Sequence, residues 1–136
     1  MPIVDRLTDV PGNSPGFGFA HAVTTTGQLA FVSGQIALDA AGQLVGPGDL
    51  AAQTEQSLAN LGRLLASLGA DWPDVVKLTW FLVDVSEIQV VRDVRDRIIR
   101  PSLGDRPNPA SSLVQVAGLF RPEFLVEVEA VVALPS

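Results

Sequence analysis

Two carboxylates with a spacing suited to acid–base chemistry, Glu127 and Glu129, stand in an apolar, strand-like segment. Residues two apart on a strand project from one face, with their bases about 7 Å apart. A carboxylate pair on one face can hold, donate or accept a proton. A solvated strand face or an interface salt bridge is the commoner origin of such a pair, so the spacing alone does not assign a function.

Other polar residues offer chemistry with less support. His21 is the only histidine, and one imidazole without a second ligand predicts no metal centre but a packing role or a place at a cleft rim. Ser33 precedes Gly34, where glycine can bring the backbone close to a ligand or can mark a β-bulge. Ser111 has a hydroxyl, but the sequence contains no Gly-x-Ser-x-Gly elbow, so a serine hydrolase is not indicated.

The composition predicts a single globular domain over residues 1–136. The chain is 47% hydrophobic and 18% charged, which supplies a core and argues against disorder. A net charge of −6 opposes a nucleic-acid partner. Cysteine is absent, which excludes a thiol nucleophile and a zinc-thiolate site. No apolar stretch is long enough to span a bilayer and no signal peptide is recognised, so we expect a cytoplasmic protein without a membrane partner. We expect no cofactor.

The first third of the sequence predicts antiparallel hairpins. An irregular loop is expected over residues 11–16. The ranges 19–24 and 29–36 have β character and flank a turn at 25–28, and a second turn leads to a return that ends near residue 45.

Two helices and a strand between them are predicted next. Asp49 is a good N-cap for a helix with leucines at helical spacing, and Gly69 stands at its C-cap. The β-branched and aromatic range 75–83 predicts a buried, central strand. Ser86 begins a second amphipathic helix, which Pro101 is expected to end.

Two further strands, 112–117 and 125–133, complete an α+β order in which both helices pack on one face of a mixed sheet. Each strand has a row of mixed polarity: Ser111, Leu113, Gln115 and Ala117 in the first, and Leu125, Glu127, Glu129 and Val131 in the second. The alternate positions of the last strand form an apolar face for the helices: Val126, Val128, Ala130 and Val132. If the mixed rows were fully exposed, their apolar members would be placed badly, so we expect burial against sister subunits.

Several segments, in order along nearly the whole chain, resemble the RidA/YjgF family. Phe-Ala-His-Ala-Val at 19–23 is similar to the family's Tyr-Ser-Gln-Ala-Val, and 31–36 contains its Ser-Gly-Gln strand. Residues 49–61 resemble the start of its first helix, and 75–84 resembles its Val-Lys-x-Thr strand ending in aspartate. Residues 109–114 and 126–130 resemble its closing pair of strands. The ordered combination, rather than any single segment, is specific.

The resemblance implies a chorismate-mutase-like fold and a homotrimer around a central barrel, with small-molecule clefts between subunits. In the deaminase branch these clefts hydrolyse enamines and imines of 2-keto acids. A glutamate there positions or activates water, and an arginine holds the substrate carboxylate. Glu127 matches that glutamate and Ser33 the family serine, which implies a catalytic residue and a ligand hydrogen bond, respectively.

Other cleft positions depart from the family pattern. Ser111 stands where the deaminase branch has arginine, and a neutral hydroxyl cannot replace a bidentate guanidinium. Phe19 replaces a tyrosine, Leu113 a frequent cysteine and Arg92 a frequent asparagine. Arg92 either restores the missing cation or lies in a salt-bridge ladder on the helix surface.

The sequence therefore predicts a RidA-like protein that hydrolyses reactive enamine or imine metabolites to a carbonyl compound and ammonia, with a weak or altered substrate range. The alternative is a trimer that binds a small metabolite without turnover. The expected partners are two further copies of the chain and a small molecule at the subunit interface.

Overall fold

The computed structural model describes residues 2–14 and 18–135. Its strands are β1 (Ile3–Leu7), β2 (Ala22–Thr25), β3 (Leu29–Gln35), β4 (Val75–Leu82), β5 (Ala110–Gln115) and β6 (Val126–Ala133). Its helices are α1 (Leu50–Ser67) and α2 (Ile88–Leu103), with short 3₁₀ turns η1 (Trp72–Asp74) and η2 (Val85–Glu87). Part of the loop expected over residues 11–16 lies outside the described residues.

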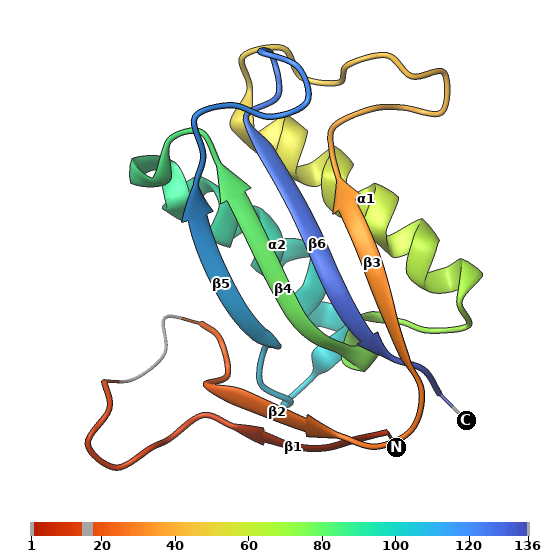
Figure 1. Cartoon of the computed structure of the whole chain (residues 1–136), viewed down its shortest axis with the longest axis vertical. Coiled ribbons are helices and arrows are strands. Elements are labelled where there is room, and N and C mark those ends of the chain that lie inside the picture. Colours follow the sequence, from red (N-terminus) through yellow and green to blue (C-terminus); the bar gives the residue numbers. More distant parts are fainter. Residues whose placement is uncertain (1, 15–17, 136) are drawn as a thin grey trace.

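The main sheet has the strand order β3-β6-β4-β5, and both α-helices lie on one of its faces (Figure 1). β4 pairs parallel with β5, whereas β6 runs antiparallel to both of its neighbours. The mixed sheet with two helices on one face is therefore confirmed, as is the central place of β4. No helix in the described part of the chain is long and apolar enough to cross a membrane.

The hairpin predicted between 19–24 and 29–36 is wrong. β2 pairs with β1, a strand that the sequence did not predict, and the two form a separate ribbon at one end of the sheet (Figure 1). β3 instead pairs with the distant β6. A turn signal between two β-like segments does not identify which strands pair. The smaller return around residues 39–45 is confirmed by a bridge between Leu38 and Leu44.

α1 follows its predicted signals closely. The Asp49 side chain accepts a hydrogen bond from the Ala52 N–H at 3.0 Å. At the other end Gly69 adopts a φ of +71°, and Ala70 donates to the Leu65 carbonyl. This is a Schellman cap, which satisfies carbonyls that the helix itself leaves unpaired.

α2 departs from its prediction at both ends. Asp84, rather than Ser86, caps the preceding turn, because its carboxylate accepts from both the backbone and the hydroxyl of Ser86. Pro101 lies inside the helix, which continues to Leu103. Proline's fixed φ is helical, so near the end of a helix it costs one donor without breaking the last turn. The helix ends at Gly104, whose φ is +61°.

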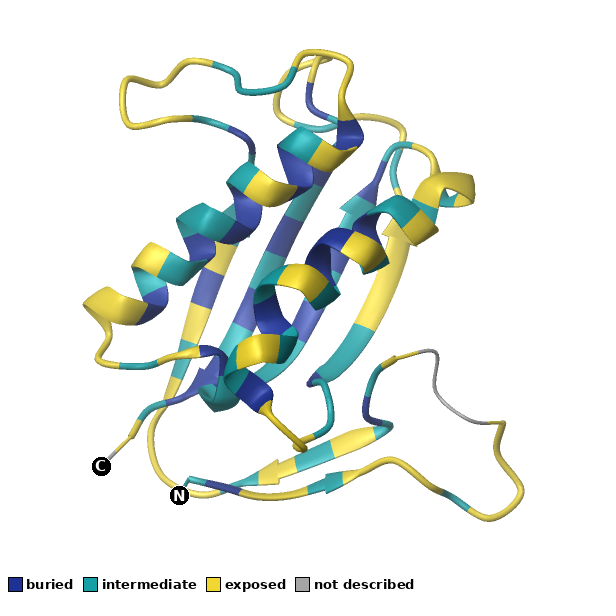
Figure 2. Ribbon diagram, turned by 180° about the vertical axis from the view of Figure 1, so that it is seen from behind, coloured by how far each residue is buried: buried dark blue, intermediate teal, exposed yellow. Residues whose placement is uncertain are grey.

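The core lies between the helices and one face of the sheet (Figure 2). The predicted apolar face of β6 is confirmed, since Val126, Val128 and Val132 have no exposed surface. Burying each such side chain contributes about 1.5–3 kcal/mol relative to exposure. The helices leave the opposite face of the sheet bare, and we call this face, which carries Phe31, Thr79 and Glu127, the bare face.

The sequence suggested that the two mixed rows lie on the same face of the sheet. In the structure they lie on opposite faces. Leu113 pairs with Trp80 and Trp80 with Val128, so Leu113 lies on the side of the helices. Glu127 pairs with Phe81 and lies on the bare face. Register between strands, which local alternation does not reveal, decides this separation.

Candidate functional site

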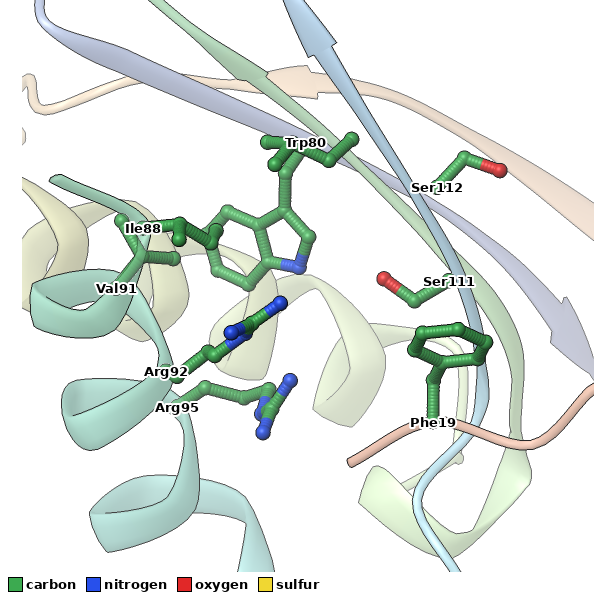
Figure 3. A pocket seen from close by; sticks show the side chains of 9 residues that line it. Phe19, Trp80, Ile88, Val91, Arg92, Arg95, Ser111 and Ser112 are labelled. Atoms are coloured by element: carbon green, nitrogen blue, oxygen red, sulfur yellow. The ribbon is translucent and has the colours of Figure 1, made fainter. Parts of the chain in front are cut away.

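A cavity of about 60 Å³ lies between α2 and the edge strand β5 (Figure 3). Four residues that the sequence analysis assigned to substrate binding line it: Phe19, Arg92, Ser111 and Leu113. Trp80 and Arg95 also line it. The structure therefore brings together most of the predicted binding residues, drawn from a loop, a helix and a strand.

The loop that carries Phe19 is fixed against the start of β5. The Ala20 N–H donates to the Pro109 carbonyl at 3.2 Å, and the Asn108 side chain donates to the Gly18 carbonyl at 2.8 Å. A parallel bridge joins Ala20 to the first residue of β5. These bonds hold Phe19 as one wall of the cavity.

Ser111 points into the cavity because of its place in the parallel register. It pairs with Leu78, whose side chain is buried beneath the helices, and neighbours in a parallel pair share a face. Its hydroxyl accordingly lies toward Arg92 and Trp80, whereas Ser112 points away (Figure 3). The residue at the family's arginine position thus does reach this cavity.

Arg95 is a cavity residue that the sequence analysis missed. It is only 7% exposed, and its Nε donates to the Asp96 carboxylate at 3.0 Å. Gly18 packs so closely against it that a Cβ there would lie 2.7 Å from Arg95 Nη2. Its position could have been found from spacing, because it lies four residues after Val91 and three before Ile98, on the apolar stripe of α2.

Glu127 lies apart from the cavity, on the bare face. Its side chain covers Gly34, where an added Cβ would lie 2.5 Å from Glu127 Cδ. Partial burial, and then the nearby charge of Glu129, raise the pKa of Glu127 above its ordinary value. A raised pKa makes this carboxylate a stronger base than an ordinary one, which favours acid–base chemistry.

Ser33 lies on the neighbouring strand and is exposed. The register between β3 and β6 shifts between Val32 and Gln35, as a β-bulge would produce. Of the two interpretations of Gly34, the bulge is therefore supported, and the close approach that glycine allows here is to the Glu127 side chain. Ser33 and Glu127 form a second group of polar residues, on the opposite side of the sheet from the cavity.

His21 lies outside the cavity lining, next to Phe19. The two rings meet edge to face with centroids 5.9 Å apart, and His21 Nε2 lies 3.0 Å from the Ser14 carbonyl oxygen. This contact agrees with a packing role. Within the described residues, no group of three or more acidic, histidine or cysteine side chains could hold a metal ion.

The sequence matches the family described as Endoribonuclease L-PSP over residues 13–134. A 2-iminobutanoate/2-iminopropanoate deaminase of Capra hircus is 37% identical over 130 residues, which cover 95% of this chain and 90% of that protein. A RutC family protein of Synechocystis is 35% identical over 119 residues, 87% of each chain. A solved structure of a Rid family protein of unknown function from Yersinia pestis superposes with a TM-score of 0.84 at 36% identity, covering 98% of this chain and 100% of that one.

The fold and these similarities identify the chain as an α+β protein with the fold of Rid proteins. The chain belongs to the Endoribonuclease L-PSP family, which is the RidA/YjgF family that its sequence motifs predicted.

Proposed function

We propose that this chain forms a homotrimer in which the bare face of one copy meets the α2/β5 cavity of the next. The composite cleft hydrolyses reactive enamine or imine metabolites to a carbonyl compound and ammonia. The observation that carries this proposal is the separation of Glu127 from the cavity by the thickness of the sheet. One copy cannot present both to a single small substrate, whereas two copies can.

The apolar surface of the bare face supports its burial against a second copy. Phe31 is 78% exposed at the centre of an edge strand, and Val114 is 42% exposed on the other edge. A hollow of about 100 Å³ beside Phe31 is lined in part by Thr79 and Val131. Soluble monomers seldom expose apolar residues across a whole sheet face.

The chemistry assigned to Glu127 is general acid–base catalysis. Its carboxylate takes a proton from water as the water oxygen bonds to the C=N carbon, and it returns this proton to the nitrogen to give a neutral carbinolamine. The carboxylate then takes the hydroxyl proton of the carbinolamine and passes it to the amino nitrogen, so the C–N bond breaks and ammonia leaves as the C=O bond forms. The raised pKa of Glu127 suits a group that both accepts and returns a proton.

The name of the Capra hircus relative supports imines of small 2-keto acids as the starting point for substrates. Ser111 indicates an altered range, because its hydroxyl supplies neither charge nor a bidentate contact. The same residue favours the second candidate function, a trimer that binds a small metabolite without turnover. The family description also names an endoribonuclease activity, but the net charge of −6 opposes binding of a phosphate backbone.

The test of catalysis is ammonia release from imines generated in situ by an amino-acid oxidase. We expect the wild type to accelerate release and Glu127→Gln to lose at least about a hundredfold of that acceleration. Glu55→Gln is the matched control, because Glu55 is exposed on α1 and pairs only with Arg97 among the described residues. Wild-type rates equal to those of buffer would refute hydrolysis and leave the binding function.

The test of assembly is the mass in solution by light scattering. We expect three times the mass of one chain, and we expect Phe31→Asp to lower it by placing a charge on the bare face. Ala51→Asp is the control, since it adds the same charge to an exposed position in the first turn of α1, where aspartate is tolerated. A wild-type monomer at micromolar concentration would contradict the proposed trimer.

A further inference from the structure

Arg95 is a buried cation that is incompletely paired. Its side chain is 8% exposed, and its Nε bonds to Asp96, whose own side chain is 48% exposed. Among the described residues, no acceptor is found for its two terminal amino groups. A buried guanidinium with unused donors is costly, because removal from water is offset only by charge pairing and hydrogen bonds.

The unused donors of Arg95 lie at the cavity. Arg92 extends its guanidinium into the same space, and the Ser111 hydroxyl points toward it from β5 (Figure 3). Two cations therefore line this cavity, and Asp96 is the carboxylate bonded to one of them.

The opposite wall of the cavity is apolar and aromatic. Trp80, which is 2% exposed, and Phe19 face the two arginines, and Ile88 closes one end. The volume of about 60 Å³ accommodates a planar headgroup rather than a whole metabolite. Cationic donors on one side and aromatic surface on the other suit a small organic anion with an apolar portion.

We propose that this cavity binds the carboxylate of a small organic acid and that Arg95 is its principal ligand. The two terminal amino groups of Arg95 form the fork that a carboxylate fits, and the Ser111 hydroxyl donates a further hydrogen bond. The arginine that the deaminase branch has on β5, at the position of Ser111, is thus replaced by Arg95 on α2, one helical turn beyond Arg92. This inference deepens the proposed function and rests on it only for the step from bound carboxylate to substrate.

The experiment is a titration of the full-length protein with 2-oxobutanoate, followed by the indole N–H resonances in NMR. The chain has two tryptophans, of which Trp80 lines the cavity and Trp72 does not. We expect a saturable shift of the Trp80 signal only. The neutral amide of the same acid should bind at least about tenfold more weakly, because it lacks the charge. Inorganic phosphate binding as tightly as the acid would overturn the assignment to a carboxylate.

Two variants test the role of Arg95. Arg95→Gln should weaken 2-oxobutanoate binding at least about tenfold. Arg97→Gln, which removes a 63% exposed arginine from the same helix, should leave binding within about twofold. If Arg95→Gln binds like the wild type, the proposal is wrong.

A gain-of-charge variant keeps the test valid if Arg95→Gln fails to fold. Ser111→Asp places a tethered carboxylate in the cavity, so it should abolish 2-oxobutanoate binding and raise Tm. Unchanged Tm with unchanged binding would overturn the proposal.

These binding experiments can fail or succeed independently of the test for imine hydrolysis. Carboxylate binding that depends on Arg95, in a protein without hydrolytic activity, would support the site and refute the enzyme. Imine hydrolysis that depends on Glu127 but not on Arg95 would support the enzyme and refute the Arg95 site.

Discussion

The contact between Gly34 and Glu127 allows the position of the carboxyl to be perturbed without altering Glu127 itself. In Gly34→Ala the new Cβ would lie 2.5 Å from Glu127 Cδ and 2.8 Å from Cγ. Since ordinary contact begins at 3.4 Å, Cδ must retreat by about 0.9 Å. Gly34 does not have a positive φ, so alanine meets no backbone strain there.

The expected effects on stability and on activity differ in size. Moving the Glu127 side chain off its rotamer costs about 0.5–1.5 kcal/mol, which lowers Tm by a few degrees. A displacement of about 1 Å in a catalytic group can reduce turnover about a hundredfold. The displaced carboxyl also loses burial, so its pKa should fall toward the ordinary value, because burial is the main cause of the rise.

Three measurements are needed: the Glu127 carboxyl pKa by NMR titration, Tm, and imine hydrolysis. Gly62→Ala is the matched control, because its Cβ would meet only Trp72 at an ordinary 3.4 Å and alanine favours the helix there. We expect that control to keep its activity and gain slight stability. If Gly34→Ala leaves both the pKa of Glu127 and turnover unchanged, the contact with Gly34 does not position the carboxyl and the prediction is wrong.

Three further predictions concern stability and charge. The folded-state pKa of Glu127 is raised, so its protonated form contributes stability that is complete below the unfolded pKa of about 4.3 and is lost as pH rises through the folded pKa. Glu127→Gln, which resembles the protonated form, should therefore have a higher Tm than the wild type at neutral pH and the same Tm near pH 4. Glu129→Gln should lower the pKa of Glu127 in the same NMR titration, since the Glu129 charge is the second cause of its rise. Gln53→Leu should lower the free energy of unfolding, measured in urea, by about 2–3 kcal/mol, because the buried Gln53 side chain forms hydrogen bonds with the backbone of Gly46, Glu123 and Leu125. As a control, Gln89→Leu at an exposed position should change this free energy by less than about 0.5 kcal/mol.

Local signals in the sequence were sufficient for most elements. The cap at Asp49, the glycine after α1 and the leucine spacing between them are short-range features, and each is confirmed. The alternation in β6 likewise predicted which of its residues face the helices. Such features depend on neighbours within about one helical turn, which a single sequence displays directly.

The pairing of strands and the burial of charged residues depend on contacts between segments that are distant in the sequence. β2 pairs with β1 rather than β3 because strand pairing depends on competition among distant segments. The same non-local register places Glu127 and Ser111 on opposite faces of the sheet, although both were assigned to one cleft.

The family, the two helices and the residues that replace the deaminase pattern can all be identified in the sequence. Helical spacing also places Arg95 on the apolar stripe of α2, but only the fold brings it to a cavity beside Ser111. The reason is physical: a charge pattern along a helix shows which residues neighbour one another, but packing against the sheet and the Gly18 loop decides which of them lose water.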